Sequence, residues 1–173
     1  METNNNISCL RQLLDEDTSR FISAEVQLKN NLNKWIVKET SVAFKIILHE
    51  YIDLMGQHIR MLESFCEAER INSLSLSNRV MKAYIDETNE KLSVCTCPEV
   101  KDACLLAAIQ GINHFKISAY GTAAAFANTL ELGKAAALFH KAELNEKSID
   151  ERLSFLAEND INPKAKSAIL LPG

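Results

Sequence analysis

The sequence is poor in the residues that interrupt helices. Its 173 residues include five glycines and three prolines, and the first proline is Pro98. Aromatic residues make up 6% of the chain, whereas hydrophobic residues together make up 47%. Few turn-forming residues in an aliphatic, alanine-rich chain are typical of packed helices. A chain of this length is long enough for one continuous hydrophobic core, so we expect a single domain over residues 1–173.

The chain also lacks an excess of positive charge. Its formal net charge is −4, and its basic residues are interleaved with acids. No basic patch is available to attract phosphates, so we expect no nucleic-acid partner. The N-terminal residues are polar and have neither the cationic start nor the apolar run of a secretory signal. No apolar run approaches the roughly 18 residues needed to span a bilayer, so we expect no membrane partner.

The cysteines are odd in number and lack the spacing of a small disulfide scaffold. The five cysteines fit reduced thiols, which predicts a cytoplasmic protein. Cys95 and Cys97 could be two thiolate ligands of a metal ion or a redox pair, but no second Cys/His pair at zinc-finger spacing accompanies them. A surface connector ahead of Pro98 is the preferred interpretation. No phosphate-binding loop or nucleophile motif is visible, so we expect no catalytic and no cofactor-binding residues, and we lean against an enzyme.

The spacing of the apolar residues predicts four long helices, at about residues 7–37, 40–69, 98–130 and 136–159. Short connections predict that these helices form two antiparallel hairpins. Residues 70–97 between the hairpins are too many for a tight turn, and they carry a helical pattern of their own around residues 76–92. The sequence therefore predicts an all-α, ferritin-like four-helix bundle with a core of about residues 7–159. A long crossover containing a short extra helix joins its two hairpins.

The apolar spacing also predicts which residues of the second and third helices face inward. The inward residues expected on the second helix are Ile47, Leu54, Met61, Leu62 and Phe65. Those expected on the third helix are Val100, Cys104, Ala107, His114, Ile117 and Gly121. On this assignment His49, His58 and His140 fall at different helical phases and predict no cluster.

Several segments resemble motifs of one protein family. Residues 113–122, Asn-His-Phe-Lys-Ile-Ser-Ala-Tyr-Gly-Thr, resemble E-H-Y-E-I-A-A-Y-G-T, a helix motif of the YciE/YciF family of ferritin-like proteins. Four further segments are similar to motifs of that family: residues 23–28, 59–65, 100–103 and 145–153. The resemblance covers roughly residues 10–156. It implies the ferritin-like bundle and a stress-associated role, and it makes the two glutamates of the helix motif the expected metal-side residues.

The chain departs from the family where metal ligands are expected. Asn113 and Lys116 stand in the place of the two motif glutamates, and Tyr51 and Leu54 replace a polar pair on the second helix. A di-metal carboxylate site needs acids from all four helices, usually with two histidines. Asparagine is a weak neutral ligand, and an inward Lys116 would bring a cation to a site built to hold cations. We therefore expect neither a di-iron centre nor a resident cofactor.

Five residues remain as candidate metal ligands: Glu25, Asp53, His114, Glu146 and Asp150. Glu25 is alternatively a buried polar residue with its bonds satisfied. His114 is better explained as a core histidine bonded to a neighbouring helix. Asp53 is turned about 100° from Leu54 on its helix. Glu146 and Asp150 share a helical face, which suits either an ion or solvent.

Three functions fit these observations. The preferred one is a non-enzymatic bundle that acts through self-association as a homodimer, because two-fold dimers are the commonest soluble assembly. The second is a residual iron, manganese or zinc protein with weak oxidase or storage activity. The third is a small-ligand or partner-binding module that uses a vacated core space lined by Leu54, Met55, His114 and Phe115. The C-terminal residues from Asn162 leave little room for the extra short helix of a cage subunit, although residues 169–171 could dock on a neighbour.

Overall fold

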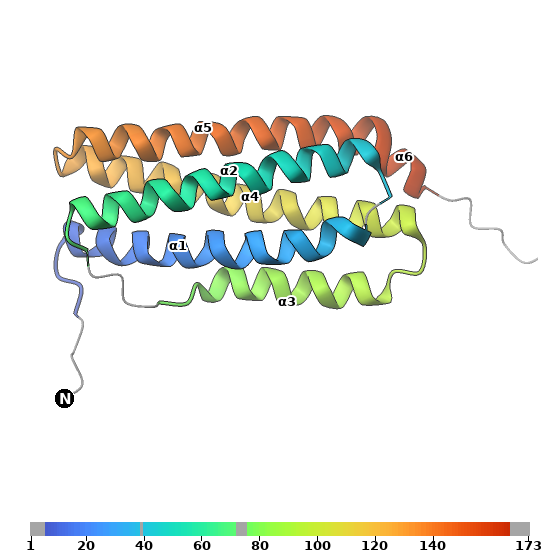
Figure 1. Ribbon diagram of the computed structural model, residues 1–173, viewed down its shortest axis with the longest axis horizontal. Coiled ribbons are helices and arrows are strands. Elements are labelled where there is room, and N and C mark those ends of the chain that lie inside the picture. The colour runs from blue at the N-terminus through green and yellow to red at the C-terminus, as the bar shows by residue number, and fades with distance from the viewer. Residues whose placement is uncertain (1–5, 39, 72–75, 167–173) are drawn as a thin grey trace, which may run out of the picture.

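The computed structural model describes residues 6–38, 40–71 and 76–166, and within these ranges the chain is helical, without strands. The long helices are α1 (Leu10–Trp35), α2 (Val42–Ala68), α4 (Pro98–Thr129) and α5 (Gly133–Leu156), as shown in Figure 1. The crossover holds α3 (Arg79–Val94), and the shorter elements are a 3-10 turn (Ile36–Lys38), a π turn (Ala157–Ile161) and α6 (Asn162–Ala165). The predicted all-α bundle is confirmed. Among the described residues, no helix combines the length and the apolar character that crossing a bilayer requires.

The long helices form a closed four-membered arrangement. Helix α1 packs against α2 and α4, and α5 packs against the same two helices. In Figure 1, α3 runs beside the bundle and carries the chain from the end where α2 stops to the end where α4 starts. It contacts α1 and α4 along this path. The two predicted hairpins and the helix-containing crossover between them are therefore present.

Local chemistry explains where several helices begin. The Ser41 side chain accepts a hydrogen bond of 3.3 Å from the backbone N–H of Phe44, which caps α2. The Asn78 side chain caps α3 in the same way, with a bond of 2.8 Å from the N–H of Met81. Pro98 lies in the first turn of α4, where its missing N–H costs nothing. Cys95 and Cys97 flank this junction, and no disulfide is formed among the five cysteines.

The last helical hairpin differs from its prediction at two places. Helix α5 begins at Gly133, three residues earlier than expected, because the turn lies before this glycine. Glu131 makes the turn in a left-handed conformation, with φ of 58°. The four-residue α6 also follows the bundle, with Pro163 in its first turn, although little room for such a helix was expected.

The inward face of α2 agrees with prediction at Ile47, Leu62 and Phe65, whereas that of α4 is rotated. Helix α2 buries Met55 and His58 where Leu54 and Met61 were expected, and those two are half-buried. Helix α4 buries Asn113 and Lys116 instead of the stripe that contains His114. A shift of one residue in the sequence turns the inward face of a helix by about 100°. Polar residues occupy part of the buried stripe of α4, so apolar periodicity alone assigned this helix the wrong phase.

Candidate functional site

A group of polar side chains from all four long helices is buried at the centre of the bundle. This polar cluster comprises Glu25 of α1, Tyr51 and His58 of α2, Asn113, Lys116 and Tyr120 of α4, and Glu146 of α5. Each of these residues is at most 3% exposed. Charged side chains are rarely buried to this extent without partners, so ion pairs and hydrogen bonds are expected among these residues.

Lys116 lies between the two carboxylates of the polar cluster. Its Nζ atom is 2.7 Å from Oε1 of Glu146 and 3.0 Å from Oε2 of Glu25. Among the described residues the only other donor near these two oxygens is Nδ1 of His58, 3.4 Å from Oε1 of Glu146, so the ammonium is the main group that compensates them. Lys116 also donates a bond of 3.2 Å to the Tyr51 hydroxyl. One cation of the chain therefore bridges acids that come from opposite hairpins.

The remaining oxygens of the two carboxylates are also hydrogen-bonded. Oε2 of Glu146 accepts bonds from the Tyr51 hydroxyl at 2.5 Å and from Nδ2 of Asn113 at 2.8 Å. Oε1 of Glu25 accepts a bond from the Tyr120 hydroxyl. The two tyrosines and the asparagine thus act as neutral donors that hold the carboxylates in their ionised form.

His58 completes the polar cluster on the α2 side. Its Nδ1 atom lies 3.3 Å from Oε1 of Glu25 and 3.4 Å from Oε1 of Glu146. The Asn145 amide lies 3.4 Å from its other ring nitrogen, Nε2. A proton on Nδ1 therefore faces both carboxylates. When both ring nitrogens carry a proton, Lys116 and His58 together balance the two negative charges.

The pKa values follow from this arrangement. Burial alone would lower the pKa of Lys116, but the negative charges of Glu146 and Glu25 raise it above its ordinary value. Burial lowers and the bonds to Glu146 and Glu25 raise the pKa of His58, and the net change is upward. Burial raises the pKa of Glu25, whereas Lys116 and His58 lower it, with a net decrease. All three shifts favour the charged forms.

The polar cluster does not fit the di-metal centre that the fold suggests. Such a centre in a ferritin-like bundle takes a glutamate from each of two helices and a Glu-x-x-His pair from each of the other two. Here Met55 lies three residues before His58, and Ile149 lies three residues after Glu146, and both are buried. The remaining acids carry two negative charges, one of which the Lys116 ammonium already compensates. Two divalent cations would face too few ligands and a buried ammonium.

A smaller ligand set does survive within the cluster. Glu25, His58 and Glu146 each offer one ligand atom, and these three atoms lie within 4.8 Å of one another. Two carboxylates and one imidazole are a common ligand set for a single divalent ion. Lys116 is in contact with both carboxylates of this set, so a metal ion would have to displace its ammonium.

The predicted candidate ligands divide into two groups. Glu25 and Glu146 meet in the polar cluster, as two members of the predicted set. Asp53 is exposed on the outer face of α2, as its helical phase indicated. His114 is not a core histidine, since its side chain is 66% exposed; its Nε2 atom lies 3.1 Å from Asp150 on α5. Asp150 therefore pairs with His114 outside the cluster.

The sequence prediction missed His58 and did not foresee the roles of the tyrosines. The expectation that His58 belongs to no cluster is wrong, because it contacts both buried acids. A usable signal was its position seven residues after Tyr51, which places both on one face of α2. An inward Lys116 was considered only as an argument against metal binding, and it is buried, but nothing in the sequence indicated that Tyr120 would bond Glu25.

The predicted ligand space in the core is not formed as expected. Met55 is fully buried in the hydrophobic core, whereas His114 is exposed, so these residues do not line one internal space. Leu54 and Phe115 are partly buried and pack against the core. The volume that a metal centre would occupy is instead filled by Lys116 and its partners.

Comparisons with known proteins agree with this architecture. Residues 6–166 match the model of a family described as a domain of unknown function (DUF892). The chain is 32% identical over 163 residues to Protein YciF of Escherichia coli (strain K12), covering 94% of this chain and 98% of the relative. The crystal structure of the E. coli stress protein YciF matches with a TM-score of 0.84 and 28% identity, over 90% of this chain and 99% of that chain. The structure of YcfI from Rhodopseudomonas palustris matches with a TM-score of 0.83, 21% identity and coverage of 89% and 97%, which shows the shared fold.

Proposed function

Because the chain belongs to the family of unknown function that includes YciF, we propose that it is a non-enzymatic ferritin-like scaffold in which a lysine replaces the metal. The observation that carries this proposal is the position of the Lys116 ammonium, 2.7 and 3.0 Å from two buried carboxylates. In a di-metal bundle, cations hold the acids of the four helices together. Here the Lys116 ammonium would do so for the acids of α1 and α5.

The chemistry of the polar cluster supports a structural role over a catalytic one. Its charged groups are saturated by one another and almost fully excluded from solvent. A catalytic metal site keeps a position open for water or substrate, and a general acid or base must reach its substrate. The network of Lys116, Glu25 and Glu146 instead links three long helices, which would fix their register.

We further propose that the scaffold acts as a homodimer within a stress response. The structural relative is called a stress protein in its title, and this is the support for that role. Large apolar side chains are exposed at the end of the bundle where α2 begins and α5 ends: Val42 is 71%, Ile46 is 53% and Phe155 is 70% exposed. Exposed apolar groups on adjacent helices suit a two-fold interface. Five cysteines without a disulfide suit the reducing cytosol.

Metal uptake tests the central part of this proposal. Purified protein would be dialysed against Mn²⁺, Zn²⁺ and, without oxygen, Fe²⁺, and the bound metal would be measured by elemental analysis. We expect well under one equivalent per chain and no ferroxidase activity. Two irons per chain, with loss of metal in Glu25→Gln or Glu146→Gln, would contradict the proposal.

A single-metal protein is the second candidate function. The proximity of Glu25, His58 and Glu146 favours it, because these residues would supply three ligands to one divalent ion. The same dialysis separates the two functions: one equivalent of metal in the wild type, lost in His58→Ala, would support the single-metal protein. Uptake that occurs only after Lys116 is replaced would support the metal-free scaffold.

A further inference from the structure

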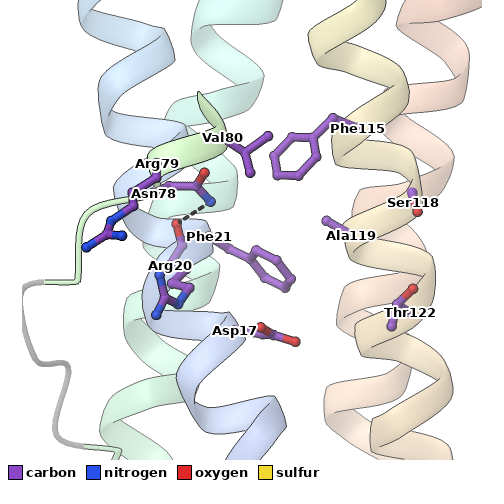
Figure 2. A pocket seen from close by; sticks show the side chains of 10 residues that line it. All are labelled: Asp17, Arg20, Phe21, Asn78, Arg79, Val80, Phe115, Ser118, Ala119 and Thr122. Atoms are coloured by element: carbon purple, nitrogen blue, oxygen red, sulfur yellow. Dashed lines mark hydrogen bonds between the residues drawn. The ribbon is translucent and has the colours of Figure 1, made fainter. Parts of the chain in front are cut away.

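A second feature of the molecule is an open groove on the outside of the bundle. It lies between α1 and α4 at the point where α3 begins, and its volume is about 320 Å³. Figure 2 shows its apolar walls, formed by Phe21 of α1, Val80 of α3, and Phe115 and Ala119 of α4. A volume of this size is at the lower end of the range for small-molecule sites.

The walls of the groove are fixed by contacts behind them. Asn78 is buried where α3 joins the groove, and its backbone N–H donates a bond of 3.1 Å to the Ser23 hydroxyl. The Phe21 ring packs against Tyr120 with 5.8 Å between ring centroids, and the Phe115 ring packs against Tyr84 with 6.2 Å. The groove is therefore held in shape without a ligand, which lowers the entropic cost of binding one.

One carboxylate of the groove lacks a partner. Three acids follow one another on α1, and the first two form ion pairs: Asp15 with Arg11 at 2.8 Å, and Glu16 with Arg20 at 2.6 Å. Asp17 forms no ion pair or hydrogen bond with any residue in the described part of the chain. Burial and the adjacent charge of Glu16 raise the pKa of Asp17, whereas Arg20 opposes them. In Figure 2 the Asp17 carboxylate points toward the α4 side of the groove.

The cations near the groove do not compensate this carboxylate directly. The guanidinium of Arg20 is held by Glu16. Arg79 is exposed, and Figure 2 shows its guanidinium directed away from Phe21 and Phe115. A half-buried anion at one end of an apolar slot is complementary to a ligand with one positive charge and an apolar body.

We propose that this groove binds a small amphipathic ammonium compound, with the ammonium group on Asp17 and an alkyl or aryl body between Phe21 and Phe115. Ser118 and Thr122 also line the groove, on its α4 wall (Figure 2). Asp17 supplies the charge selectivity and the aromatic walls supply the contact area. The site lies outside the polar cluster, so it does not require the proposed scaffold function.

The probe for this site is 2-phenylethylammonium, added to the full chain. Binding would be followed by NMR through the signals of Ala119, Phe115 and Thr122, with calorimetry as the second measurement. For so small a ligand we expect a dissociation constant on the order of 1 mM. Two compounds of the same shape serve as ligand controls: neutral 2-phenylethanol and anionic 3-phenylpropionate should both bind at least about fivefold more weakly.

Two variants test the residues, and a third is the matched control. Asp17→Asn removes the charge with little change of shape and should weaken the ammonium probe about fivefold or more, to the level of 2-phenylethanol. Ala119→Leu should abolish binding of both the ammonium probe and 2-phenylethanol, because the larger side chain fills the groove. Asp53→Asn, which removes an exposed acid on α2 outside the groove, should change nothing. Circular dichroism would check that each variant is folded.

Three results would overturn the proposal. One is the absence of any saturable shift at about 10 mM probe, roughly ten times the expected dissociation constant. Another is equal binding of the ammonium and the neutral compound, with no effect of Asp17→Asn. The third is binding that survives in a folded Ala119→Leu variant, which would place the ligand elsewhere.

Discussion

Replacing Lys116 with methionine removes the cation of the polar cluster while keeping much of its volume. The Glu25 and Glu146 carboxylates would then be left buried, at 1% and 0% exposure, without the ammonium that contacts both. Removing one partner of a buried ion pair costs about 3–5 kcal/mol, because the remaining charge stays desolvated. For a chain of this size, that loss corresponds to a fall in Tm of about 10–15 °C.

The loss should depend on pH in a defined direction. Without Lys116, burial and mutual repulsion raise the pKa of at least one carboxyl of the pair above its unfolded value of about 4.3. Folding then takes up a proton, so the variant is least stable at high pH and recovers as the pH falls toward about 5. The same variant should gain metal affinity, because Glu25, His58 and Glu146 are left without a competing cation. Metal at about 100 times its dissociation constant would restore roughly 2.7 kcal/mol.

Thermal unfolding followed by circular dichroism measures each of these effects. Wild type and Lys116→Met would be compared at about pH 5 and pH 8, roughly on either side of neutrality, with EDTA and then with Zn²⁺. The control is Lys147→Met, which removes an exposed lysine paired with Glu143 on the same helix and should cost less than about 1 kcal/mol. A Lys116→Met protein whose Tm at pH 8 lies within about 3 °C of the wild-type value would refute the reasoning. Such a shift corresponds to a loss of only about 1 kcal/mol, well below the predicted loss of about 3–5 kcal/mol.

Three further predictions concern the cluster and the assembly. In an NMR titration the pKa of His58 should lie above its ordinary value of about 6.5. The stabilisation from His58 is then complete below about pH 6.5 and is lost as the pH rises through the folded pKa. A folded pKa below the unfolded value would contradict its contacts with the two acids. Tyr51→Phe should lower the free energy of unfolding in urea by about 1–3 kcal/mol, because Glu146 loses a buried donor; an unchanged value would show that the hydroxyl is not needed there. Light scattering should return a homodimer for the wild type and a monomer for Phe155→Glu, since this residue is 70% exposed; a monomeric or many-subunit wild type would rule the dimer out.

The fold could be predicted from the sequence because its signals are long and local. Apolar spacing over more than 20 residues located each main helix, and the length of the crossover distinguished two hairpins from a simple up-and-down bundle. Boundaries were less accurate. The fourth long helix begins at Gly133 and not at about residue 136, because the left-handed turn that separates α4 from α5 lies at Glu131.

The polar cluster was only partly predictable because it breaks the rule on which the helix phases depended. Lys116, Asn113 and His58 occupy buried positions that an apolar pattern assigns to the surface. The stripe of α4 was therefore placed about one residue out of phase, and His58 was left off the inward face of α2. The substitutions of the family glutamates were visible in the sequence. That Lys116 would reach both Glu25 and Glu146 required the packing of three helices, which one sequence does not specify.

The most direct test of the lysine-for-metal account is a crystal structure of protein grown with iron, manganese and zinc in the medium, with anomalous diffraction data recorded at each metal edge. The account predicts no anomalous peak between Glu25 and Glu146, and electron density for the Lys116 ammonium in contact with both carboxylates. An anomalous peak within bonding distance of Glu25, His58 and Glu146, with the Lys116 side chain displaced, would contradict it.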